Sequence, residues 1–231
     1  MRKRVGRSPW RVIFFAVLWV LSAQAFGHSG FALAQSAPGV PTLQVRKIAF
    51  LPFFKGVQSS NIQETLACPL CRLYLEPEGV APGGEFVLTD YVQEALVLKH
   101  EDRVFPARLV KSTLEGISGD KKEDTPLSLA QKTGKALGTD LVMVGFIWRF
   151  RDRVGGAAGV ESPASVAFAL HLLSVETGRV IWNAGFNETQ QSLSENILDA
   201  RTFLKRGGRW LTAPELARYG VEEVFERYPF R

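Results

Sequence analysis

The sequence predicts an α/β fold in which helices pack against a mixed β-sheet that ends in a three-strand meander. Three apolar segments of strand length follow one another within residues 141–188, separated by turn residues: LVMVGFIWRF, SVAFALHLLS and RVIWNAGFNE. Segments with apolar residues at helical spacing lie before and after this meander. We therefore expect the meander to form the centre of a single domain, residues 35–231.

Residues 1–34 have the pattern of a signal peptide. Five basic residues precede a short apolar run, residues 12–21, whereas a bilayer span needs about 20 residues. Cleavage after Ala34 leaves a flexible mature end; cleavage after Ala25 and an uncleaved membrane anchor are the alternatives. The pattern predicts an exported protein of a Gram-negative-type envelope, in the periplasm or peripheral at the outer membrane.

This leader changes what the net charge implies. It holds 5 of the 28 Lys and Arg residues and none of the 23 Asp and Glu residues, so 23 basic residues face 23 acidic ones in the mature chain. A neutral mature chain gives no reason to expect a nucleic-acid partner. No apolar segment of spanning length follows the leader, so we expect no transmembrane span there.

The first part of the mature chain combines a strand, a long connection and a helix. Residues 45–54, VRKIAFLPFF, predict a strand covered on both faces, which Pro52 ends. Residues 55–84 lose periodicity and collect Gly, Pro, Ser and Asn, so we expect a loop of about thirty residues that is either functional or mobile. Thr89 or Asp90 then begins a helix.

Shorter elements lead into the meander. Residues 103–107 predict a short strand, and residues 109–114 a helical turn. Residues 125–137 predict a helix, because Thr125 followed by proline is typical of a helix start and Gly138 of a helix end. We expect the helices to pack on the sheet.

The three strands of the meander differ in burial. Residues 141–150 are almost wholly apolar, which predicts a central strand buried on both faces. Residues 165–174 carry large apolar side chains on one face and small alanines on the other. Residues 179–186 alternate apolar with polar residues, which predicts a half-exposed strand. Gly178 lies in the turn before this third strand, at a position where a positive φ is needed.

Two helices are predicted after the meander. Ser192 with Glu195, and Thr212 with Glu215, match the capping-box pattern of a helix start. A basic, Gly-rich turn, residues 205–210, joins the two.

Cys68 and Cys71 are the only cysteines, and both lie in the predicted long loop. In an oxidising compartment this pair predicts a structural disulfide. Two alternatives stay open: thiol–disulfide exchange, which needs a reactive thiolate, and metal binding, for which the sequence has no second pair of Cys or His ligands. We expect no metal and no cofactor.

Two basic segments are candidates for contact with an anion or a partner. The first, Arg149, Arg151 and Arg153, falls on one side of a strand as it leaves the core. The second, in the turn before the last helix, contains Arg206, Arg209 and Trp210. The alternative is a solvated strand end, with Asp152 and Glu161 nearby, for the first segment and a solvated turn for the second.

Catalytic motifs are missing from the sequence. It contains no G-x-S-x-G elbow, no phosphate-binding loop and no H-E-x-x-H pattern. His171 lies within an apolar strand, which favours a buried, hydrogen-bonded imidazole over a catalytic base. We expect a protein that is not an enzyme.

Three short motifs carry a family resemblance: Pro52-Phe53 after the first strand, Gly138-Thr139-Asp140 before the central strand, and TGRVIW, residues 177–182. In this order they resemble exported bacterial domains of the curli-secretion lipoprotein type, the amino-terminal domain of the Tol-system β-propeller protein, and the lipoprotein activators of penicillin-binding proteins. The resemblance implies a sheet-and-helix domain that docks on an envelope protein or on a wall or outer-membrane component. It carries over no catalytic residue. Thiol–disulfide exchange at the two cysteines is the alternative function.

Overall fold

The computed structural model describes residues 47–55, 57–58, 66–68, 70, 74–75, 79–118, 124–157, 159–191 and 208–230. The chain divides into two units, Met1–Val40 and Pro41–Arg231, and all described residues belong to the second. The predicted signal peptide and the predicted helix that begins after Ser192 lie outside the described residues.

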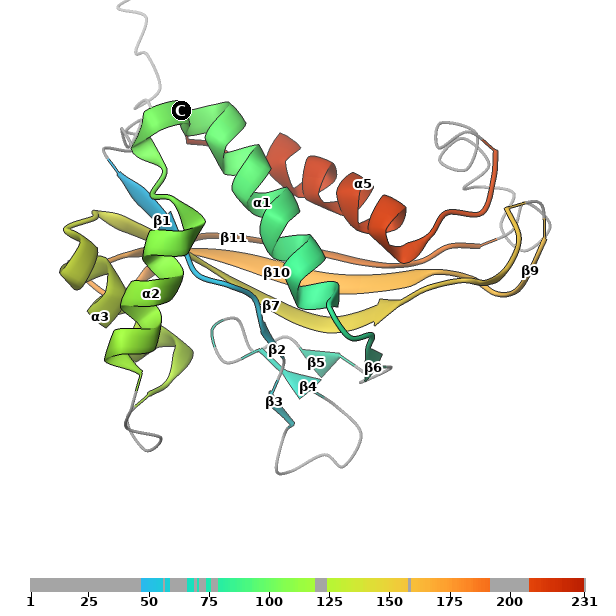
Figure 1. Cartoon of the computed structure of the whole chain (residues 1–231), viewed down its shortest axis with the longest axis horizontal. Helices are drawn as coiled ribbons and strands as arrows, with labels where there is room; N and C mark the ends of the chain where they lie inside the picture. The colour runs from blue at the N-terminus through green and yellow to red at the C-terminus, as the bar shows by residue number, and fades with distance from the viewer. Residues whose placement is uncertain are drawn as a thin grey trace, which may run out of the picture. The chain divides into compact units, whose positions relative to one another are not determined.

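A six-stranded mixed sheet forms the centre of the second unit (Figure 1). Three long strands form the antiparallel meander in the order β7 (Leu141–Arg151), β10 (Ser165–Ser174) and β11 (Val180–Thr189). Three short strands pair in parallel with the other side of β7: β1 (Ile48–Phe50), β2 (Phe54–Lys55) and β6 (Gly79–Val80). This arrangement confirms the predicted α/β class, the mixed sheet and the three-strand meander.

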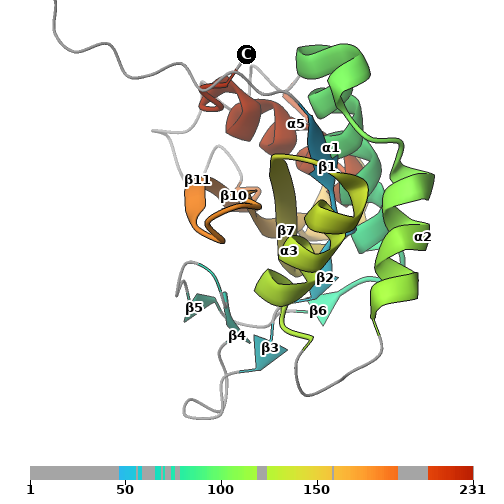
Figure 2. The ribbon, with the colours of Figure 1, turned by 90° about the vertical axis from the view of Figure 1, so that its left-hand side faces the viewer.

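Helices cover both faces of this sheet. The first face packs against α1 (Gly84–His100) and α5 (Ala213–Glu226), which lie side by side (Figure 1). The second face packs against α2 (Ala107–Ile117) and α3 (Pro126–Leu137). Figure 2 shows α2 and β11 on opposite sides of the view, because α2 contacts β1 and β11 is the last strand at the other edge of the sheet. Each face therefore has its own apolar core.

The strands carry the predicted side-chain pattern. Every residue of β7 from Leu141 to Phe150 is buried, with Met143 and Ile147 in the first core and Val142 and Val144 in the second. On β10 the large apolar side chains enter the first core, and β11 is half exposed. Burial of both faces explains why β7 reads as a continuous apolar run.

Local helix and turn signals are confirmed where the structure describes them. The Thr125 hydroxyl accepts a hydrogen bond from the Ser128 amide and caps α3, which ends at Gly138 with a φ of 63°. Thr212 and Glu215 form the predicted capping box at the start of α5. Gly178 has a φ of 66° in the β10–β11 turn, a conformation that glycine adopts without steric cost.

The predicted start of the first helix and the predicted strand at residues 103–107 were wrong. Helix α1 begins at Gly84, well before Thr89, because Gly83 turns the chain with a φ of 86°. The Thr89 hydroxyl donates instead to the Glu85 carbonyl inside this helix, at 2.6 Å. Residues 103–107 form no strand: a short 3₁₀ turn ends at Arg103. Helix α2 then begins at Ala107 and is longer than the predicted turn.

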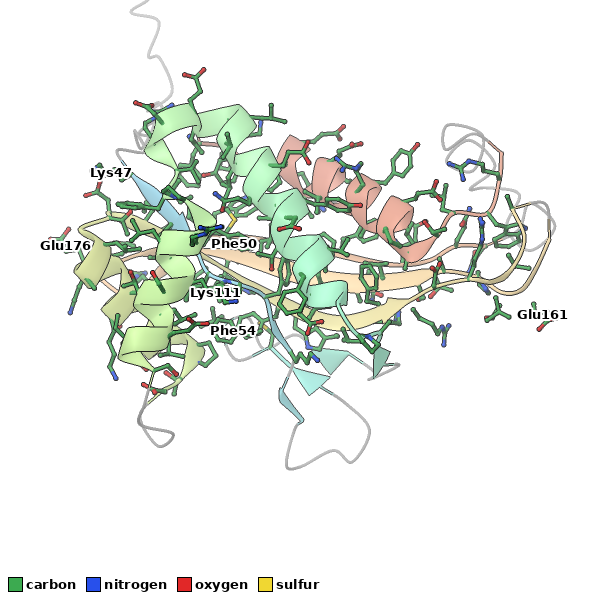
Figure 3. All side chains as sticks on the ribbon, viewed as in Figure 1. Lys47, Phe50, Phe54, Lys111, Glu161 and Glu176 are labelled. Atoms are coloured by element: carbon green, nitrogen blue, oxygen red, sulfur yellow. The ribbon has the colours of Figure 1, made fainter. Side chains whose placement is uncertain are left out.

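The segment predicted as a long loop contains strands of two residues. In addition to β2 and β6 it holds a small sheet of β3 (Val57–Gln58), β4 (Leu66–Ala67) and β5 (Tyr74–Leu75). Such short strands leave no periodicity in a sequence. A second small hairpin, β8 (Val154–Gly155) and β9 (Val160–Ser162), follows β7 and carries Glu161 (Figure 3).

Candidate functional site

Arg149 of the first basic segment spans the second face of the sheet. Its Nη2 donates a hydrogen bond to Oδ1 of Asn187 on β11, at 2.6 Å. The strand register places Ala167 of β10 between the two residues, and the small alanine side chain lets the guanidinium pass. Arg149 is buried and connects the outer strands of the meander. Its predicted contact with an anion stays a prediction.

The end of β7 is joined to the start of α5. The Asp152 carboxylate accepts hydrogen bonds from the Ala213 amide at 2.9 Å and from the Arg153 amide at 2.8 Å. Arg153 Nη1 donates to the Trp210 carbonyl. A carboxylate at a helix N-terminus satisfies an amide that has no partner inside the helix. Arg151 is exposed at the same end of the strand.

Arg209 of the second basic segment forms a paired contact with Glu215. Its Nη2 lies 2.6 Å from Glu215 Oε1, and its Nη1 lies 3.2 Å from Oε2. These hydrogen bonds, together with that from the Thr212 amide, lower the pKa of Glu215 to about 2. They also raise the pKa of Arg209. The guanidinium therefore supports the capping box of α5.

The structure brings Arg153 to Trp210 and its neighbour Arg209, although Arg153 is far from both in the sequence. Gln190, which the sequence gave no reason to select, holds this junction together. Its Nε2 donates to the Arg209 carbonyl at 2.9 Å, and its Oε1 accepts from the Leu211 amide at 2.7 Å. Arg206 lies outside the described residues. Partner contact by these residues stays a prediction.

Cys68 lies against the second face of the sheet. Its Sγ is 3.5 Å from Nε2 of His171 on β10, and both residues are buried. Burial lowers the pKa of His171 to about 4, so the imidazole is neutral near pH 7. This agrees with the predicted buried, hydrogen-bonded histidine. Cys71 lies outside the described residues, so its bond to Cys68 stays a prediction.

The surroundings of Cys68 differ from those that thiol exchange requires. Thiol exchange needs an accessible thiolate, usually beside a positive charge. Cys68 is only 2% exposed, and the histidine beside it is neutral. Within the described part of the chain, no group of three or more His, Cys, Asp or Glu side chains could hold a metal ion.

Strand β11 presents a row of backbone groups on its outer edge. The Gln190 amide donates to the Ala164 carbonyl at 3.0 Å, which makes the neighbouring pair, Ser165 and Thr189, a non-hydrogen-bonded pair. The register is regular from Thr189 back to Trp182, so every second residue turns its N–H and C=O away from β10. These residues are Asn183, Gly185, Asn187 and Thr189. Among the described strands, only β10 pairs with β11.

The opposite edge of the sheet consists of short strands. Strands β1, β2 and β6 fill the outer side of β7. The Phe105 amide donates to the Ile48 carbonyl at 2.9 Å and so covers β1 in turn. Sequence reasoning did not identify the β11 edge as a site, although the half-exposed alternation of β11 is typical of an edge strand.

A hollow of about 820 Å³ lies next to the start of β11. The end of α3 and the β10–β11 turn line it with both signs of charge: Lys135 and Arg179 beside Asp140 and Glu176. This mixture selects no single ligand charge.

Among the described helices, none has both the length and the apolar character needed to cross a membrane.

No protein-family model matches the chain, and no curated protein matches it. Among solved structures, it is similar to the PelC dodecamer from Paraburkholderia phytofirmans, with a TM-score of 0.44 and 13% identity over 83% of this chain and 93% of that one. It is also similar to lipoprotein GNA1162 from Neisseria meningitidis, with a TM-score of 0.42 and 13% identity over 71% and 92% of the two chains. The C-terminal domain of LpoB from Escherichia coli gives a TM-score of 0.39 and 14% identity over 68% and 90%.

These similarities are distant, because all three TM-scores lie below 0.5. Similarity at this level transfers no partner, activity or location to the chain.

Proposed function

We propose that this protein is a non-enzymatic, exported accessory protein that docks on another component of the cell envelope through the outer edge of β11. The observation that carries the proposal is the row of outward backbone groups at Asn183, Gly185 and Asn187. An open strand edge is a ready template for pairing with another chain, and proteins usually blunt such edges. This sheet has short strands at one edge and the ten residues of β11 at the other.

Two further features support this function. The leader pattern of residues 1–34 directs the chain out of the cytoplasm, and the mature chain has equal numbers of acidic and basic residues. Surface recognition therefore depends on shape and hydrogen bonding more than on net charge. The alternative, thiol–disulfide exchange, has no supporting contact, since Cys68 is buried beside a neutral imidazole.

The proposal is tested by photo-crosslinking in intact cells. A photo-reactive residue at exposed Asn183 on β11 is compared with one at exposed Lys111 on α2, a helix that contacts β1 and lies away from the β11 edge (Figures 2 and 3). We expect a discrete adduct with an envelope protein from Asn183 and none of that mass from Lys111. Equal adducts from both positions, or none from Asn183, contradict docking at β11.

Export is tested separately by the intact mass of the protein recovered from the periplasmic fraction. We expect a mass that lacks residues 1–34. A full-length protein in the cytosol contradicts this part of the proposal.

A further inference from the structure

The C-terminal end of α5 reaches over the outer edge of β11. Arg227, the residue that follows the helix, donates from Nη2 to the Gly185 carbonyl at 3.1 Å. The indole Nε1 of Trp182, also on β11, donates to the Arg227 carbonyl at 3.2 Å. The backbone of Arg227 is thus held against the strand, and its guanidinium lies at the strand's edge.

Gly185 lies within the outward row, between Asn183 and Asn187. An added strand makes hydrogen bonds with every second residue of the edge strand, so it needs the Gly185 carbonyl as an acceptor. The Arg227 guanidinium occupies this acceptor. A charged side chain on an exposed edge is one of the devices by which proteins prevent unwanted strand pairing.

We propose that Arg227 guards the β11 edge, and that the partner is an extended polypeptide segment that pairs with β11 and displaces Arg227 from Gly185. The inference rests on the proposed docking function and adds the mode of binding and its control. The Arg227–Gly185 hydrogen bond prevents unspecific strand pairing at this edge. It breaks when a segment with matching backbone donors binds to β11.

The contact of Arg227 with Gly185 is easily broken. The Arg227 side chain is 52% exposed, and its other partner, the Glu223 carboxylate, is 50% exposed at 3.4 Å. Exposed pairs of this kind are weak, so the guanidinium can move into solvent at little cost. Removing this contact should therefore raise the fraction of protein bound to its partner by about two- to fivefold.

Arg218 provides a matched control on the same helix. Its side chain is 49% exposed and pairs with Glu94 of α1 at 3.2 Å, and its guanidinium lies over the Tyr91 ring. It makes the same kind of surface contact as Arg227 but toward α1. Arg218→Ala thus removes an arginine and an ion pair from α5 without opening the β11 edge.

The experiment measures the yield of the Asn183 photo-adduct in cells that express the unsubstituted chain, Arg227→Ala or Arg218→Ala. We expect the yield to rise about two- to fivefold with Arg227→Ala and to stay unchanged with Arg218→Ala. An adduct whose yield is the same in all three overturns the guard and leaves docking at β11 intact. A yield that falls with Arg227→Ala also overturns the guard, because Arg227 then belongs to the binding surface. No adduct in any of the three overturns the docking function itself.

Discussion

His100 Nε2 lies 2.9 Å from the Tyr228 hydroxyl and joins the end of α1 to the tail that follows α5. The two rings also meet edge to face, with centroids 5.5 Å apart, and the Trp182 ring of β11 packs edge to face with Tyr228, with centroids 5.1 Å apart. This contact closes the first-face core at its end. It also buries a histidine whose protonation depends on folding.

Stability should fall as the pH drops from about 6.5 to about 4. Desolvation by burial, and then the charges of Arg103 and Lys99, lower the pKa of His100 from 6.5 to about 4. Burial lowers the pKa of His171 equally. Within this window the unfolded chain binds protons that the folded chain does not, so stability is complete above the window and is lost through it, by up to about 1.4 kcal/mol per pH unit for each histidine.

Urea unfolding at pH 7.5, 6.0 and 5.0 measures this dependence. His100→Gln should flatten the slope by about half, since one of the two histidines remains. A stability that is constant from pH 7.5 to 5.0 contradicts the burial of both imidazoles.

Two glycine substitutions should have opposite signs. A Cβ at Gly220 of α5 would lie 2.5 Å from the Phe186 ring of β11, so Gly220→Ala should destabilise the protein by about 1–3 kcal/mol. A Cβ at Gly116 of α2 meets no atom within 4 Å, so Gly116→Ala should stabilise by about 0.5–1 kcal/mol through helix propensity. Thermal unfolding of both variants decides the matter. Stabilisation by Gly220→Ala would mean that α5 does not pack closely on β11.

The predicted disulfide between Cys68 and Cys71 should contribute modestly to stability. Closing a loop of about 15 residues already yields only about 3 kcal/mol, and this loop is much shorter. Thiol titration of freshly isolated, denatured protein should find no free sulfhydryl. Two titratable thiols would exclude the disulfide, and the contact of Cys68 with His171 would then be that of a buried thiol.

Local signals in the sequence predicted local structure well. The Thr212–Glu215 capping box, the end of α3 at Gly138 and the turn at Gly178 each depend on residues within one helical turn or one hairpin. The start of α1 was missed because two adjacent glycines, Gly83 and Gly84, read as part of a loop.

The sites depend instead on register and on contacts between distant residues. Arg149 and Asn187 meet only because β7, β10 and β11 pair in one particular register. Gln190 contacts the backbone of Leu211, and Cys68 contacts His171, across long stretches of chain. No spacing rule within one sequence specifies such pairs, because the sheet must form before the partners face each other. The outward row on β11 is a consequence of the same register.

The most direct test of the docking edge is a proline at Asn187. The Asn187 amide points away from β10, so Asn187→Pro removes an outward donor and leaves the β10 ladder intact, as for proline on the exposed side of an edge strand. Asn187→Ala is the matched control, because both variants lose the side-chain contact with Arg149. Both should remain folded, as thermal unfolding will show.

The decisive measurement is the yield of the Asn183 photo-adduct in these two variants. If an extended partner pairs with β11, Asn187→Pro should lower the yield about tenfold relative to Asn187→Ala, the effect of losing a backbone hydrogen bond at the interface. Equal yields from the folded proline and alanine variants would contradict the account, because the partner would then not depend on the outward backbone groups of β11.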